Sequence, residues 1–259
     1  MEFSTAVLLS AAGFVGGVIS SIVGAASLIT FPALLAAGVP PVLASASNCV
    51  AMTPSNFVAA WVDSRRLPAF RPAFWRVLAI TAVGSAIGAW LLMVTPDTSF
   101  AKLVPVLIGV ATLLFAFSGN VRGWIVRHGE DPALHSARAD RIGLVLLAPV
   151  SVYAGYFGAG TSIMLLAILS LGPASDFRSV NALKNLLSGI TGVVAIVIFI
   201  VAGMVAWPQT LAMVTGGLIG GYVGGRLARV VPEAIVRWIV IVVGATVTVI
   251  SVRKYWWGG

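Results

Sequence analysis

Apolar positions occur along the chain in long runs that carry no charged residue. These runs cover residues 3–62, 77–96, 103–121, 142–175 and 185–225. Each run holds at least one segment of about 20 residues, the length of a helix that crosses a hydrocarbon core of about 30 Å. The alternating pattern of membrane β-strands is absent. The pattern therefore predicts an all-α integral membrane protein.

The sequence contains an internal repeat around two glycine-rich interruptions. The segments IVGAASLITFPALLAAGVPP (residues 22–41) and YFGAGTSIMLLAILSLGPAS (residues 156–175) share a glycine, a small hydroxyl residue, an apolar run and a Gly/Pro stop. This match predicts two transmembrane repeats, residues 1–121 and 142–259, joined by a basic linker at residues 122–141. Each repeat should contain one broken segment and three plain helices, at residues 43–62, 73–95 and 101–120 and at residues 180–203, 207–228 and 235–252.

The basic residues indicate how the broken segments enter the membrane. If each is a re-entrant helical hairpin, the two repeats are inverted, both chain ends lie outside, and twelve Lys and Arg face the cytoplasm against three outside. If each crosses the bilayer, the balance is ten against five. The positive-inside rule favours the hairpins, with the basic loops cytoplasmic. A strongly tilted, broken single span stays open as the alternative.

The breaks themselves carry candidate binding chemistry. Irregular backbone inside a bilayer is tolerated where protein or a water-filled cavity satisfies it. The helix after each break begins with free N–H groups and the positive end of its dipole, which attract anions. The candidate substrate-binding residues here are Ser27, Gly158, Gly160, Thr161 and Ser162. The alternative is that such glycines only allow close helix packing, which is our interpretation of GGLIGGYVGG (residues 216–225) and of Gly84 with Gly88.

A polar stripe follows each broken segment. In the second repeat Asn181, Lys184, Asn185 and Ser188 share one helix face. A lysine inside a membrane span is costly and is a functional candidate by default, although its side chain could also snorkel to the headgroups. The first repeat has an uncharged stripe instead, made of Ser45, Asn48, Met52, Thr53, Ser55 and Asn56. We therefore expect an asymmetric site that includes Asn48, Asn181, Lys184 and Asn185.

Composition and charge exclude several other functions. Hydrophobic residues make up 59% of the 259 and charged residues 9%, with a net charge of +8. The basic residues lie between apolar runs, so binding to nucleic acid is not expected. With no Asp or Glu inside a span, a carboxylate cation site is not expected, and positive, hydrogen-bond-donating groups favour an anion. We expect no cofactor, no metal site and no enzyme active site, and we expect Cys49 only to pack.

The sequence resembles the TauE/SafE family of sulfite and organosulfonate exporters over nearly its whole length. The resemblance rests on the glycine-rich break before a proline-terminated apolar helix, and on the segments NALKNLL, AGMVAW and GGYVGGRLARVVP. It implies a multi-pass permease of the cell (inner) membrane with two related halves. It also implies transport of small sulfur-containing oxyanions or carboxy-sulfonates, coupled to an ion gradient.

These observations predict a secondary transporter that moves a small anion across the plasma membrane by alternating access. The anion would bind between the two breaks, with Gly24, Gly158 and Gly160 as flexible points. An anion channel with the same site is the alternative. The sequence leaves open the exact substrate, the direction of transport, the coupling ion (proton or sodium) and whether the chain forms a homodimer.

Overall fold

The chain folds into helices throughout the part that the computed structural model describes, which is residues 2–22, 24–62, 64–67, 72–128, 137–169, 177–227 and 233–257. Ten α-helices and one short 3₁₀ turn are found in these ranges. In chain order the elements are α1 (Phe3–Ile22), α2 (Ser27–Ala36), α3 (Pro41–Val62), η1 (Ser64–Arg66), α4 (Pro72–Val94), α5 (Asp97–His128), α6 (Ala137–Tyr156), α7 (Thr161–Leu169), α8 (Phe177–Val201), α9 (Trp207–Leu227) and α10 (Glu233–Trp256). The predicted all-α class is confirmed.

Both predicted breaks are present, and they have the same backbone geometry. Gly24 follows α1 with φ 77°, and Gly158 follows α6 with φ 78°, a left-handed conformation that glycine adopts without a Cβ penalty. The N–H of Gly24 donates to Ile19 O at 3.1 Å, and the N–H of Gly158 donates to Tyr153 O at 3.2 Å. Each glycine therefore follows the last turn of its helix as a left-handed residue and turns the chain into the next, shorter helix.

The plain helices also match the predicted ranges, with one difference at the linker. The helix α5 continues to His128 instead of ending near residue 120, and α6 begins at Ala137 instead of residue 142. The residues 122–128 contain no proline, so helix propagation from α5 has no local reason to stop. Much of the expected linker is therefore helical, and residues 129–136 lie outside the described part.

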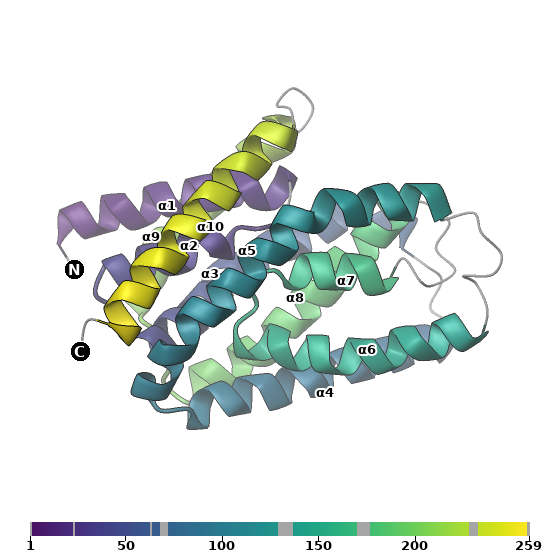
Figure 1. Ribbon diagram of the computed structural model, residues 1–259, viewed down its shortest axis with the longest axis horizontal. Coiled ribbons are helices and arrows are strands. Elements are labelled where there is room, and N and C mark those ends of the chain that lie inside the picture. Colours follow the sequence, from purple (N-terminus) through teal and green to yellow (C-terminus); the bar gives the residue numbers. More distant parts are fainter. Residues whose placement is uncertain are drawn as a thin grey trace.

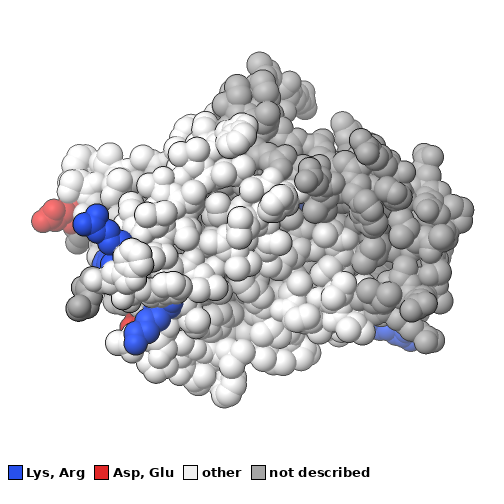
Figure 2. All heavy atoms as spheres, viewed as in Figure 1, with Lys and Arg blue, Asp and Glu red and all other residues white. Residues whose placement is uncertain are grey.

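Five helices have the length and apolar composition to cross a membrane: α1, α4, α5, α8 and α10. Large apolar side chains on their outer faces are exposed, for example Phe117 at 61% and Val201 at 85%. Such surfaces suit contact with lipid. In Figure 2 nearly all of the charged side chains on the visible face lie toward the two ends of the long axis, and the described surface between them is almost entirely uncharged. Figure 1 shows both chain ends at the same end of that axis.

Glycines bring two helix pairs into backbone contact. A Cβ on Gly216 would lie 1.9 Å from Ser10 O, and one on Gly220 would lie 2.0 Å from Phe14 O, so α9 packs on α1 without intervening side chains. In the same way, a Cβ on Gly88 of α4 would lie 2.0 Å from Val152 O of α6. Small residues allow this close approach in membranes. The packing interpretation is confirmed for Gly216, Gly220 and Gly88, whereas a Cβ on Gly221 would meet no heavy atom within 4 Å.

Candidate functional site

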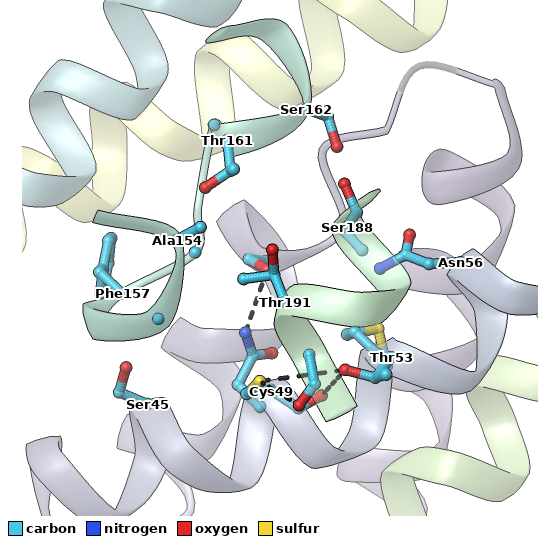
Figure 3. Close-up of a pocket in the computed structure, with 18 of the residues that line it drawn as sticks. Ser45, Cys49, Thr53, Asn56, Ala154, Phe157, Thr161, Ser162, Ser188 and Thr191 are labelled. Atoms are coloured by element: carbon cyan, nitrogen blue, oxygen red, sulfur yellow. Dashed lines mark hydrogen bonds between the residues drawn. The ribbon is translucent and has the colours of Figure 1, made fainter. Parts of the chain in front are cut away.

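The two breaks lie at one polar cavity in the interior of the helix bundle. The cavity has a volume of about 80 Å³ and is lined by the α1–α2 break, α3, the α6–α7 break and α8 (Figure 3). One water needs about 10–15 Å³ of such space, so the cavity has room for several waters or a small ion. Six of the predicted site residues line it: Ser27, Asn48, Gly158, Gly160, Thr161 and Ser162.

Lys184 brings a positive charge to the point where the breaks meet. A Cβ placed on Gly24 would lie 3.4 Å from Lys184 Nζ, 3.3 Å from Ser162 Cβ and 3.4 Å from Ser162 Oγ. The first break, the start of α7 and the ammonium group of α8 are therefore neighbours. Lys184 is 7% exposed, and within the described part of the chain no hydrogen bond or ion pair to it is found. An ammonium group buried at such a position needs a partner or a ligand.

Several hydrogen-bond donors at the cavity have no partner. The buried hydroxyl groups of Thr161, Ser188 and Thr191 make no hydrogen bond to any described residue. At the second break the N–H of Thr161 donates to Gly158 O and that of Ile163 to Gly160 O, whereas the N–H of Ser162 finds no acceptor among the described residues. Unsatisfied buried donors are costly, and a bound ligand or water would satisfy them.

On the first-repeat side, the polar groups are held in a fixed network. Thr30 Oγ1 donates to Asn48 Oδ1 at 2.5 Å, and Asn48 Nδ2 donates to Ser27 Oγ at 3.1 Å. This network orients the Asn48 amide and leaves the Ser27 hydroxyl hydrogen free to donate to a ligand. Asn48 therefore holds Ser27 at the start of α2, where the positive end of the helix dipole lies.

Aromatic side chains pack against the second break. Phe157 is 5% exposed, and its ring lies 5.1 Å from the ring of Phe31 on α2, in an edge-to-face contact. Its ring also lies 6.2 Å from that of Phe100 and 6.3 Å from that of Tyr153. The Tyr153 hydroxyl donates to Ala159 O at 2.7 Å. These contacts fix the loop between α6 and α7 and join it to α2 across the two repeats.

Only some residues of the two predicted polar stripes line the cavity. On α3, the residues Ser45, Asn48, Met52, Thr53 and Asn56 line the cavity, whereas Ser55 donates back to Met52 O at 2.7 Å. On α8, Ser188 lines the cavity and Lys184 lies next to it, but Asn181 and Asn185 are not among the lining residues. Asn185 is buried at 8% exposure.

Sequence reasoning missed several lining positions, among them Thr191, Gly192 and Cys49. Thr191 and Gly192 extend the α8 stripe by one turn, so the same i, i+3, i+4 spacing carried past Ser188 would have found them. Cys49, expected only to pack, also lines the cavity. It lies beside Asn48 in the sequence, and its Sγ is 3.9 Å from Thr53 Oγ1.

The chemistry of the cavity is that of a small anion site. None of its lining residues is Asp, Glu or His, and no group of His, Cys, Asp and Glu able to hold a metal is found in the described ranges. What the cavity offers is hydroxyl and amide donors next to one ammonium group. Donors and a cation in a region of low dielectric favour a negative charge.

A helical membrane protein with helix breaks around a polar cavity has the architecture of a membrane transporter. The chain belongs to the family described as sulfite exporter TauE/SafE, whose sequence profile matches residues 9–250. It is 26% identical to a "Probable membrane transporter protein" of Haemophilus influenzae over 96% of this chain and 95% of the relative. It is 27% identical to "Probable membrane transporter protein YfcA" of Escherichia coli K12 over 90% of this chain and 84% of that protein. No solved structure matches the chain.

The family membership confirms the resemblance that the sequence motifs indicated. The chain is a multi-pass membrane protein of a transporter family and not an enzyme. The family also implies a small anion as the substrate, which agrees with the donors and the positive charge at the cavity.

Proposed function

We propose that the chain is a secondary transporter of the plasma membrane that moves sulfite, a sulfonate or a related organic acid by alternating access. The anion binds between the two helix breaks. The first turns of α2 and α7 donate to it through Ser27, Thr161 and Ser162, and Lys184 supplies the opposite charge. The family description, sulfite exporter, supports this class of substrate.

The observation that carries this proposal is the meeting of two distant breaks at one ammonium group. Gly24 and Ser162 lie 138 positions apart in the sequence, yet a Cβ on Gly24 would be in contact with both Ser162 Oγ and Lys184 Nζ at 3.4 Å. A packing role alone would not need three unpartnered hydroxyls at this point. Rocking of one repeat against the other, with Gly24, Gly158 and Gly160 as hinges, would expose the anion to one side and then the other.

We further propose that the two repeats, residues 1–121 and 142–259, are inverted and that each broken segment is a re-entrant hairpin. Both chain ends lie at one end of the molecule and the C-terminal end of α5 lies at the other (Figure 1), which supports an odd number of crossings in each repeat. The helix contacts support it as well, because α1 packs on α9 and α6 packs on α4. The helices α1 and α6 hold the same place in the two repeats, and so do α4 and α9, so the two contacts are equivalent. In the first hairpin the arms are α1, with 20 residues, and α2, with 10. The arm formed by α1 is longer than the short arm that we expected.

The hairpin arrangement predicts that both chain ends lie outside the cytoplasm. A reporter that is active only in the periplasm should therefore be active when it is fused after Gly259. The same reporter fused within the linker, after residue 130, should be inactive, and it serves as the matched control. A cytoplasmic signal at the C-terminus would contradict the inverted repeats and favour tilted single spans.

The transport proposal is tested with the purified chain in proteoliposomes. We expect uptake or release of one or more of sulfite, sulfoacetate, taurine and sulfate at carrier rates, and none in liposomes without protein. No flux of any of these anions would contradict the proposal. Ion currents far above carrier rates would instead indicate an anion channel, since a channel with the same site needs no alternating closure.

A further inference from the structure

The cavity has a second pole, formed by two carbonyl oxygens that the anion does not need and by two hydroxyl oxygens whose lone pairs stay available when the hydroxyl hydrogen is donated to the anion. We propose that this pole binds Na⁺, the coupling ion of the transporter, at the C-terminal end of α6. Its ligands are the carbonyl oxygens of Ala154 and Gly155 and the hydroxyl oxygens of Thr161 and Thr191. This proposal rests on the transport function proposed above, and it names sodium as the second ion that the site carries.

The carbonyl groups at the end of α6 are left free by the break. The N–H groups of Phe157 and Gly158 both donate to Tyr153 O, at 2.9 and 3.2 Å. Gly158 therefore does not donate to the carbonyl of Ala154, its usual partner in a continuing helix. No described residue donates to the carbonyls of Ala154 or Gly155, and both residues line the cavity. The end of a helix where carbonyls are free carries the negative end of the dipole, which favours a cation.

Two buried hydroxyl groups complete the oxygen set. Thr161 is 6% exposed and Thr191 is 5% exposed, and neither hydroxyl has a hydrogen-bond partner. In Figure 3 Thr161 and Ala154 lie on one side of the cavity, Ser162 and Ser188 lie on the other side with their hydroxyls directed toward each other, and Thr191 lies between the two sides. Ser162 is the residue that lies against Gly24 and Lys184. The two poles therefore share Thr161, whose hydroxyl can bind the cation through its oxygen and donate its hydrogen to the anion, and Ser162 belongs to the anion pole alone.

The chemistry of these ligands favours sodium over a proton. A proton-coupled site needs a side chain that takes up and releases the proton. No described residue that lines the cavity is Asp, Glu or His, and the neighbouring Lys184 is assigned to the anion as its positive charge. Neutral carbonyl and hydroxyl oxygens suit a hard cation, and in secondary transporters the C-terminal ends of broken helices coordinate Na⁺ while N-terminal ends hold anionic groups. A cation next to the anion in a region of low dielectric strengthens the binding of both.

The test measures the melting temperature of the purified protein in detergent with NaCl, KCl or choline chloride at equal ionic strength. We expect NaCl to raise the melting temperature by a few degrees over both other salts. Thr191→Val should remove this shift, and Thr191→Ser, which keeps the hydroxyl, should retain it. Thr81→Val is the matched control, because Thr81 is also buried and its hydroxyl is also unpartnered, but it does not line the cavity.

Anion transport provides the second readout. Anion flux in proteoliposomes should fall at least tenfold when Na⁺ is replaced by choline, and the apparent affinity for the anion should rise with Na⁺ concentration. Equal melting temperatures in the three salts, together with full flux in choline, would overturn the sodium site and leave the transport function standing. Lys184→Ala separates the two proposals, since it should lose anion flux but keep the sodium shift.

Discussion

Replacement of Lys184 by alanine is expected to abolish anion transport while the protein still folds and inserts. The ammonium group lies beside Gly24 and Ser162, and no other charged side chain is among the residues of the cavity or this contact. A hydrogen bond to a charged group contributes about 1.5–3 kcal/mol, or roughly 10- to 150-fold in affinity, and the low dielectric of the site adds to it. We expect anion flux to fall at least about 100-fold.

The matched control for this variant is Lys102→Ala. Lys102 is an exposed lysine on α5, so its removal changes the net charge equally without touching the cavity. It should transport at the normal rate. Size-exclusion profiles of both variants show whether the folded protein is present. Normal flux in Lys184→Ala would remove this residue from the binding site, and the anion would then have to be held by helix N-termini and hydroxyls alone.

Replacement of Gly220 by alanine is expected to destabilise the fold through the α1–α9 contact. The added Cβ would lie 2.0 Å from Phe14 O and 2.7 Å from Phe14 C, and these are backbone atoms that cannot turn away as a side chain can. The two helices must separate, and overpacking of this kind costs about 1–3 kcal/mol. The melting temperature in detergent should fall accordingly, and less folded protein should be recovered from the membrane.

Gly221→Ala makes the same change at the next position and serves as its control. A Cβ at Gly221 meets no heavy atom within 4 Å, so this variant should retain the stability of the original chain or gain slightly, because alanine is the better helix former. Equal stability of the two variants would contradict the close backbone packing of α1 on α9.

The helices and the two breaks could be predicted from the sequence because each has a strong local cause. Lipid requires long apolar helices, and a glycine such as Gly24 or Gly158 marks the place where a helix ends in a left-handed residue. The end of α5 was harder to predict, since the residues from Arg122 to His128 hold no proline and only one glycine, Gly123, and the change from apolar to polar composition does not itself stop a helix.

The site was predictable only in part, because a stripe of residues identifies a helix face but not the neighbour that it meets. The α8 stripe indicated the right face, yet only the packing decides that Ser188 and Thr191 line the cavity and that Asn181 and Asn185 do not. The contact of Lys184 with Gly24 joins positions 160 residues apart, and no local pattern encodes such a pairing. Cys49 was missed for the same reason, since a thiol in an apolar run usually packs.

The central claim, that the two breaks and Lys184 form one anion site, is tested most directly by locating a bound anion. Selenite resembles sulfite in charge and shape, and its selenium gives an anomalous signal in a crystal. We predict one strong anomalous peak in the cavity, within hydrogen-bond distance of Lys184 Nζ and the Ser162 hydroxyl. A protein that transports the anion but shows a cavity free of selenium, with the peak at another place in the helix bundle, would contradict the account.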